Sequence, residues 1–206
     1  MSMLGMLGKV AMGIMVAKTV GKALGGGSGG GISDMLGGLL GGSKGTDNQA
    51  SQGNKLPDLM GKLGDSNSSG LGDLLGNVLS GGKVEATPDQ EKQAEIILKA
   101  MINAAKADGE IDAEEQRKIT KHLGDVSTEE LELVRQIMKE PQDLPSLISS
   151  VPAGMEQQVY LMSLLAINLD SKPEAQYLDQ FAKGLNINEQ QCNEIHTKLG
   201  VPSLYG

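Results

Sequence analysis

The stretch ATPDQEKQAEIILKAMINAAKADGEIDAEE, residues 86–115, carries helix start and stop signals in the expected order. Residues 87–90 (TPDQ) form a capping box, with threonine as the N-cap, proline at the first helical position and glutamine three residues after the cap. Ile97, Met101 and Ala104 then recur at helical spacing until an acidic, glycine-containing break interrupts the pattern. The stretch therefore predicts an amphipathic helix, an acidic turn and the start of a second helix.

The same start signal recurs through the C-terminal half of the chain. It is found at residues 112–115 (DAEE), 127–130 (STEE), 171–174 (SKPE) and 188–191 (NEQQ). The apolar residues between these signals follow helical spacing, and strand-like alternation is absent from the sequence pattern. We therefore predict an all-α fold, a compact bundle of about seven short helices over residues 85–201, preceded by a Gly-rich arm that is largely disordered.

Composition divides the chain near residue 84. Residues 1–83 hold 23 of the 29 glycines, with seven Lys and five Asp for a net charge of +2, whereas residues 84–206 hold 11 Lys and Arg against 21 Asp and Glu, for a net charge of −10. We predict an apolar segment at 1–25, a low-complexity linker at 26–84 and an acidic helical domain at 85–201. This charge and the absence of Trp argue against nucleic-acid binding, which needs clustered basic residues or stacking platforms.

The apolar segment at 1–25 has the features of a membrane-associated or self-associating helix. Gly13, Ala17, Gly21 and Gly25 recur every four residues and would form one ridge of small residues, which allows two helices to approach closely in lipid. The longest charge-free run after the first lysine is residues 10–17, which is shorter than the roughly 20 residues of a spanning helix. We therefore expect a short insertion, an interfacial helix or self-association through the ridge, with a flexible apolar tail as the alternative.

Two separated motifs carry a family resemblance. Residues 100–115 (AMINAAKADGEIDAEE) resemble the signature of TerB-like domains, named for tellurite-resistance proteins. Residues 159–167 (VYLMSLLAI), followed by Tyr177-Leu178, are similar to the uncharacterised bacterial family that includes the inner-membrane protein YebE. The resemblance implies an all-helical fold, an acidic surface that binds divalent metal, no enzyme activity, and a location at the bacterial inner membrane or in the cytoplasm.

The acidic turn is also a candidate cation site. Asp108 closes one predicted helix, and a weak internal repeat places Asp170 at the end of another, where the helix macrodipole disfavours an anion. Either the free N–H groups of the next helix compensate, which makes the stretch a capped turn, or a divalent cation does. Oxygen-only ligands point to Ca²⁺ or Mg²⁺, although Ala113 and Ile119 stand where an EF-hand needs Gly and Glu. The candidate metal ligands are Asp108, Asp112, Glu115, Asp170 and Glu174.

Three functions follow as hypotheses. The first is a non-enzymatic, envelope-associated binding or scaffold protein, linked to stress by its resemblance. Its arm contacts membrane or self-associates, and its acidic domain binds an unknown protein or a divalent cation. The second is a metal-dependent hydrolase, and the third is a purely structural interaction module. Against the hydrolase, we expect Lys106 and Lys172 to be solvated at the surface, Cys192 to be a small core residue without an internal disulfide, and His122 and His196 to stand alone.

Overall fold

The computed structural model describes residues 3, 5–7, 9–10, 87–109, 111, 117, 128–167, 169 and 171–206. All regular structure within these residues is helical, which confirms the predicted all-α class. The helices are α5 (Pro88–Ala105), α7 (Thr128–Lys139), α8 (Leu144–Ser150), α9 (Glu156–Leu165), α10 (Lys172–Gly184) and α11 (Glu189–Leu199). The predicted linker at 26–84, the ridge of small residues and the helix start at 112–115 lie outside the described residues.

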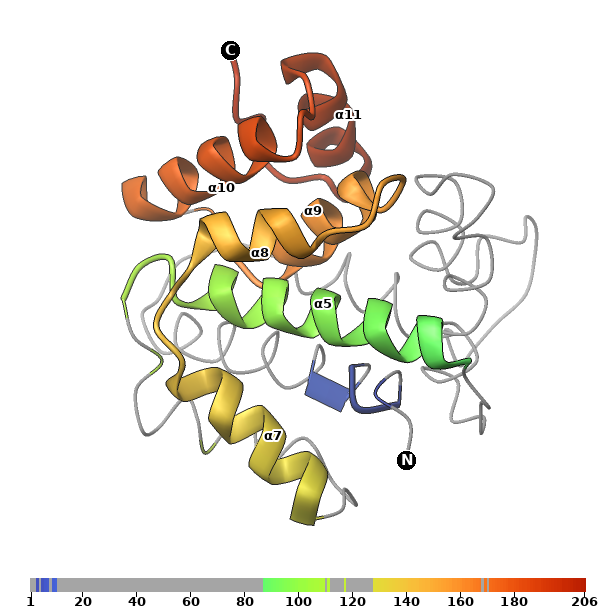
Figure 1. Cartoon of the computed structure of the whole chain (residues 1–206). Helices are drawn as coiled ribbons and strands as arrows, with labels where there is room; N and C mark the ends of the chain where they lie inside the picture. The colour runs from blue at the N-terminus through green and yellow to red at the C-terminus, as the bar shows by residue number, and fades with distance from the viewer. Residues whose placement is uncertain are drawn as a thin grey trace, which may run out of the picture.

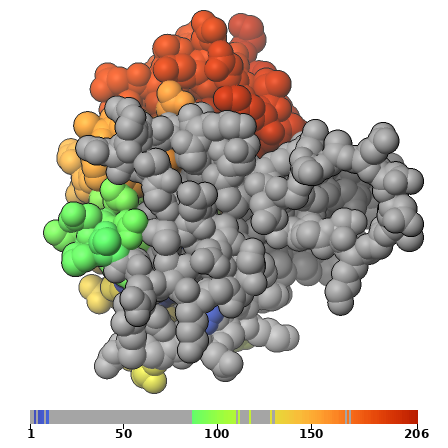
Figure 2. Space-filling model, turned by 90° about the vertical axis from the view of Figure 1, so that its right-hand side faces the viewer, coloured from blue at the N-terminus to red at the C-terminus, as the bar shows by residue number. Residues whose placement is uncertain are grey.

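The helices are stacked around α5, the longest of them (Figure 1). Helices α8 and α9 cover one side of α5, α10 and α11 lie beyond them, and α7 lies on the opposite side. The side view shows the same order, with α10 and α11 at one end of the molecule and α7 at the other (Figure 2). Helices α8 and α10 approach closely at Gly184, where an added Cβ would lie 2.2 Å from Cδ1 of Ile148.

Three of the predicted capping boxes are present. Thr87 N–H donates to Oε1 of Gln90 at 2.8 Å, and Oγ1 of Thr87 accepts from Gln90 N–H at 3.3 Å. Reciprocal pairs of the same kind begin α10 at Ser171 and α11 at Asn188. Gly200 closes α11 with a φ of 65°, a left-handed conformation that glycine adopts without steric cost. These local signals explain why the helix boundaries follow the sequence closely.

The centre of the bundle is built around α9 and the few aromatic residues. Every residue from Gln158 to Leu164 is buried, which is the pattern of a helix enclosed on all sides. Most of the buried core is aliphatic, and three of the chain's four aromatic residues are also buried. Phe181 lies between Tyr160 and Tyr177, with ring centroids 6.3 Å and 5.8 Å away. The aromatic rings therefore join α9 to α10.

Candidate functional site

The acidic turn begins where α5 ends. Lys106 is the C-cap of α5, and Gly109 N–H donates to the Lys106 carbonyl at 3.1 Å. Gly109 has a φ of 153°, a positive value that favours glycine over other residues. Asp108 is exposed to solvent at the tip of the turn, and Ile111 returns into the core. The turn is thus fixed at its base by apolar burial and presents a carboxylate outward.

Lys106 is not a solvated surface residue, so the expectation for this side chain was wrong. It is buried, and its Nζ donates to the carbonyl oxygens of Ile137 at 3.2 Å and Glu140 at 2.5 Å. These carbonyls lie at the C-terminal end of α7, where helix carbonyls lack intrahelical donors and the macrodipole is negative. A cation at this position therefore fastens the end of α7 to the end of α5.

Of the five predicted metal ligands, the structure describes Asp108 and Glu174. Glu174 is buried at the N3 position of α10, and its Oε2 accepts from the backbone N–H and the hydroxyl of Ser171 at 3.1 Å and 3.0 Å. Asp112, Glu115 and Asp170 lie outside the described residues. Among the residues that are described, no three His, Cys, Asp or Glu side chains are grouped to hold a metal ion. The Ca²⁺ or Mg²⁺ site stays a prediction, and a capping role is shown for Glu174.

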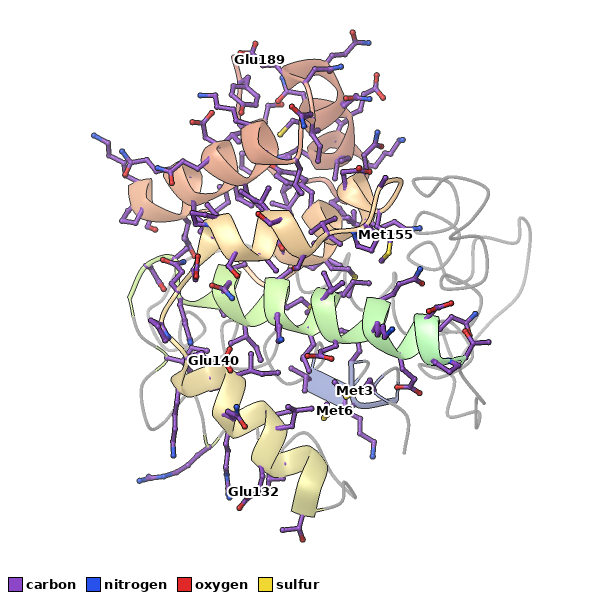
Figure 3. The ribbon with its side chains drawn as sticks, in the orientation of Figure 1. Met3, Met6, Glu132, Glu140, Met155 and Glu189 are labelled. Atoms are coloured by element: carbon purple, nitrogen blue, oxygen red, sulfur yellow. The ribbon has the colours of Figure 1, made fainter. Side chains whose placement is uncertain are left out.

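The N-terminal residues form a contact that the sequence analysis did not predict. The described residues between 3 and 10 are helical, and Met3, Met6, Leu7 and Val10 follow the spacing of a single apolar face. Met6, Leu7 and Val10 are at most 1% exposed and belong to the same apolar core as the helices of the domain. Figure 3 shows Met3 and Met6 beside α5, on the side where α7 lies. We call residues 3–10 the N-terminal segment.

A polar contact orients the N-terminal segment on α5. The backbone N–H of Met3 donates to Oε2 of Glu91, a half-buried residue in the first turn of α5. By helical spacing, Ala94 and Leu98 lie on the Glu91 side of α5, and both are fully buried in the shared core. We call this side of α5, which carries Glu91, Ala94 and Leu98, the docking face, because Glu91 makes the hydrogen bond to Met3 and the other two residues belong to the apolar core that the segment shares.

The energetics of docking are closely balanced. Burial of a large apolar side chain contributes about 1.5–3 kcal/mol, whereas fixing the backbone of one residue costs about 1–2 kcal/mol. Among the six residues of the N-terminal segment that the structure describes, the side chains of Met6, Leu7 and Val10 are buried. Because roughly two residues are ordered for each side chain buried, the two terms nearly cancel, and contacts such as that with Glu91 decide the outcome.

A buried polar cluster links α9 to α11. The hydroxyl of Tyr160 lies 3.0 Å from Sγ of Cys192 and 2.9 Å from Nε2 of His196. Nδ1 of His196 lies 2.6 Å from the carbonyl oxygen of Pro202. Tyr160, Cys192 and His196 are all fully buried. Cys192 and His196 are four residues apart on α11, so helical spacing places them on one face of that helix. Their partner Tyr160 lies on α9, 32 residues before Cys192, and is not indicated by this spacing.

The hydrogen-bonding groups of this cluster satisfy one another when His196 is neutral. The Pro202 carbonyl can only accept, so Nδ1 carries the proton, and Nε2 accepts from the Tyr160 hydroxyl. The Tyr160 oxygen then accepts from the Cys192 thiol. Burial raises the pKa of the Cys192 thiol and of the Tyr160 hydroxyl and lowers the pKa of His196. A buried thiol with a raised pKa is a poor nucleophile, so the cluster is structural.

Replacing Tyr160 with phenylalanine tests this structural role. The change removes the central hydroxyl and leaves Nε2 of His196 and the Cys192 thiol buried without their partner, so we expect the free energy of unfolding to fall by about 1–3 kcal/mol. Tyr177→Phe is the matched control, because the buried Tyr177 hydroxyl has no hydrogen-bond partner in the described part of the chain. Urea denaturation should show a loss for Tyr160→Phe and none for Tyr177→Phe; equal losses would contradict the assignment.

His196 should make stability depend on pH. Burial lowers the pKa of His196 in the folded protein, whereas the unfolded chain titrates near about 6.5. Between these two values the unfolded state binds a proton that the folded state does not, so stability should fall as the pH is lowered below about 6.5. The contribution cannot exceed about 1.4 kcal/mol per pH unit. Urea titrations from pH 7 to 5 should give a shallower pH dependence for His196→Gln than for wild type, and parallel curves would refute this prediction.

The C-terminal residues are held against α11 and α10. Asn193 pairs with the backbone of Tyr205, donating to its carbonyl at 2.8 Å and accepting its N–H at 3.2 Å. Lys183 donates to Oδ2 of Asp179 at 2.8 Å, and the Tyr205 hydroxyl donates to Oδ1 at 2.8 Å. These hydrogen bonds, that from Lys183 above all, hold the pKa of Asp179 below its usual value. An open groove of about 590 Å³ lies between α11 and the C-terminal residues Tyr205 and Gly206. Its lining is the solvent side of α11 and gives no indication of a particular ligand.

Residues 2–199 match the model of the DUF533 family, whose description reads "protein of unknown function". The chain belongs to the DUF533 family. The DUF533 match includes the N-terminal segment and extends to the last residue of α11, so both partners of the docking contact lie inside it. No curated protein and no solved structure matches the chain. No helix within the described residues combines the length and the apolar character needed to cross a membrane.

Proposed function

We propose that this DUF533 protein is a non-enzymatic binding protein that attaches to a membrane surface through its N-terminal segment. The observation that carries the proposal is the apolar stripe of Met3, Met6, Leu7 and Val10, which is already in use as a binding surface on the docking face. A short helix with one apolar face and a lysine off that face is suited to lie in the plane of a lipid surface. Lys9 supplies that lysine.

The polar groups of the domain support a binding role over catalysis. Tyr160, Cys192 and His196 have the functional groups of an active site, but each is buried and hydrogen-bonded inside the cluster. Catalysis needs a nucleophile or base that is activated and within reach of a substrate. This cluster offers neither, and its packing indicates that it joins α9 and α11.

The remaining parts of the proposal rest on the sequence. The resemblance to TerB-like domains supports a link to envelope stress, and the net charge of −10 over residues 84–206 is compatible with a cation or a basic protein as a further partner. Asp108 is one of the exposed acidic residues of this domain. We place membrane attachment first because the side chains that would contact lipid, those of the apolar stripe, are identified.

Vesicle flotation of the full-length protein tests the proposal. Leu7→Asp places a charge on the apolar stripe, whereas Gly5→Asp adds the same charge where a side chain meets open space. We expect wild type and Gly5→Asp to float with vesicles of phosphatidylcholine containing phosphatidylglycerol, and Leu7→Asp to remain with the unbound protein. Equal flotation of Leu7→Asp and Gly5→Asp would contradict attachment through the apolar stripe.

A further inference from the structure

We propose that the helical domain inhibits its own membrane attachment, because the N-terminal segment cannot dock on α5 and enter lipid at the same time. The inference rests on the proposed function and adds its regulation. Met6, Leu7 and Val10 are the side chains that lipid would have to bury, and in the structure the domain has already buried them. The docked state is thus a closed state, and the membrane-bound state requires its opening.

The geometry makes the two states exclusive. Met3 and Met6 lie beneath α5 (Figure 3), and the Met3 N–H contacts Glu91 on the docking face. The opposite side of α5 is covered by α8 and α9, so the segment docks on the side that it shares with α7. By helical spacing, Gly5 and Lys9 lie off the apolar stripe. Neither of these two residues supplies an apolar side chain with which to hold a membrane.

Glu91 is the residue that biases the closed state. Its side chain accepts the Met3 N–H, and this hydrogen bond is lost when the segment leaves the docking face. The apolar contribution to docking is largely offset by the entropy of ordering the segment. A change at Glu91 therefore shifts the population of the open state without altering the side chains that bind lipid.

The test compares two acidic residues in the first turn of α5. Glu91 contacts the N-terminal segment, whereas Asp89 is exposed and shares only the favourable position near the helix N-terminus. We expect the vesicle partition coefficient of full-length Glu91→Ala to rise about tenfold over wild type, which corresponds to about 1.4 kcal/mol. Asp89→Ala should bind vesicles as wild type does. The double variant Glu91→Ala/Leu7→Asp should not bind, because the released segment has lost its apolar face.

The possible outcomes separate this inference from the proposed function. Equal vesicle binding by wild type, Glu91→Ala and Asp89→Ala would overturn self-inhibition and leave membrane attachment standing. Failure of all three proteins to bind, Glu91→Ala included, would overturn both. A rise in Asp89→Ala equal to that in Glu91→Ala would assign the effect to the start of α5 rather than to the Met3 contact, and would also overturn the inference.

Discussion

Phe181→Ala is expected to lower the free energy of unfolding by about 3–5 kcal/mol, the largest single-residue effect that we predict. Phe181 is fully buried on α10 and lies between the rings of Tyr160 and Tyr177. Removing the ring takes away its apolar burial and leaves a cavity that two large aromatic neighbours cannot easily fill. The loss is measured by urea denaturation monitored by circular dichroism.

Phe181→Leu is the control for this prediction. Leucine preserves most of the apolar volume, and we expect a loss of less than about 1.5–2 kcal/mol. A Phe181→Ala variant that loses under about 1 kcal/mol would show that the aromatic contact between α9 and α10 does not hold the core together.

Lys106→Met is expected to lower the free energy of unfolding by about 1.5–3 kcal/mol. Methionine keeps a flexible apolar chain in the buried position but cannot donate to the carbonyls of Ile137 and Glu140. The end of α7 then loses both its hydrogen-bond donor and a cation next to the negative end of its dipole. The effect should be visible in urea denaturation of the full-length protein.

Lys99→Met on the same helix provides the comparison. Lys99 pairs with Glu95 at 2.9 Å, and its side chain is 38% exposed, so we expect a change within about 0.5 kcal/mol. If Lys106→Met and Lys99→Met have equally small effects, Lys106 does not act as a cap and belongs to the class of ordinary surface lysines.

The sequence was sufficient for features that depend on neighbours three or four residues apart. The boxes at Thr87, Ser171 and Asn188 each close within one helical turn, so the pattern alone located them. The N-cap of α8 also closes locally, with Oδ1 of Asp143 accepting Ser146 N–H at 3.0 Å, but it was not singled out from the sequence. The helix class followed from these signals and from apolar spacing.

Contacts between distant residues were beyond the sequence. A lysine inside an acidic stretch is typical of a surface, and the carbonyls that bury Lys106 come from residues 31 and 34 positions later. In the sequence, the small residues at positions 13–25 were singled out and the stripe of Met3, Met6, Leu7 and Val10 was not; the spacing of this stripe does not show which surface buries it. Its contact with Glu91 spans 88 residues, and no local pattern indicates it. For this reason the docked segment had to be found in the structure.

The family match and the docking contact together give the N-terminal segment a defined place. The DUF533 match covers residues 2–199, so the segment and α5 are parts of one family pattern. The structure places the apolar side chains of the segment within the core of the domain. One chain therefore carries both the helical N-terminal segment and the site on α5 that holds it.

The most direct test of this account is hydrogen exchange of the backbone amides of residues 3–10 in the full-length protein, measured by mass spectrometry without lipid. Docking predicts that these amides exchange at least about tenfold more slowly in wild type than in Leu7→Asp, with Glu91→Ala in between. Exchange in wild type as fast as in Leu7→Asp would show that the N-terminal segment is not held on α5, and would contradict the account.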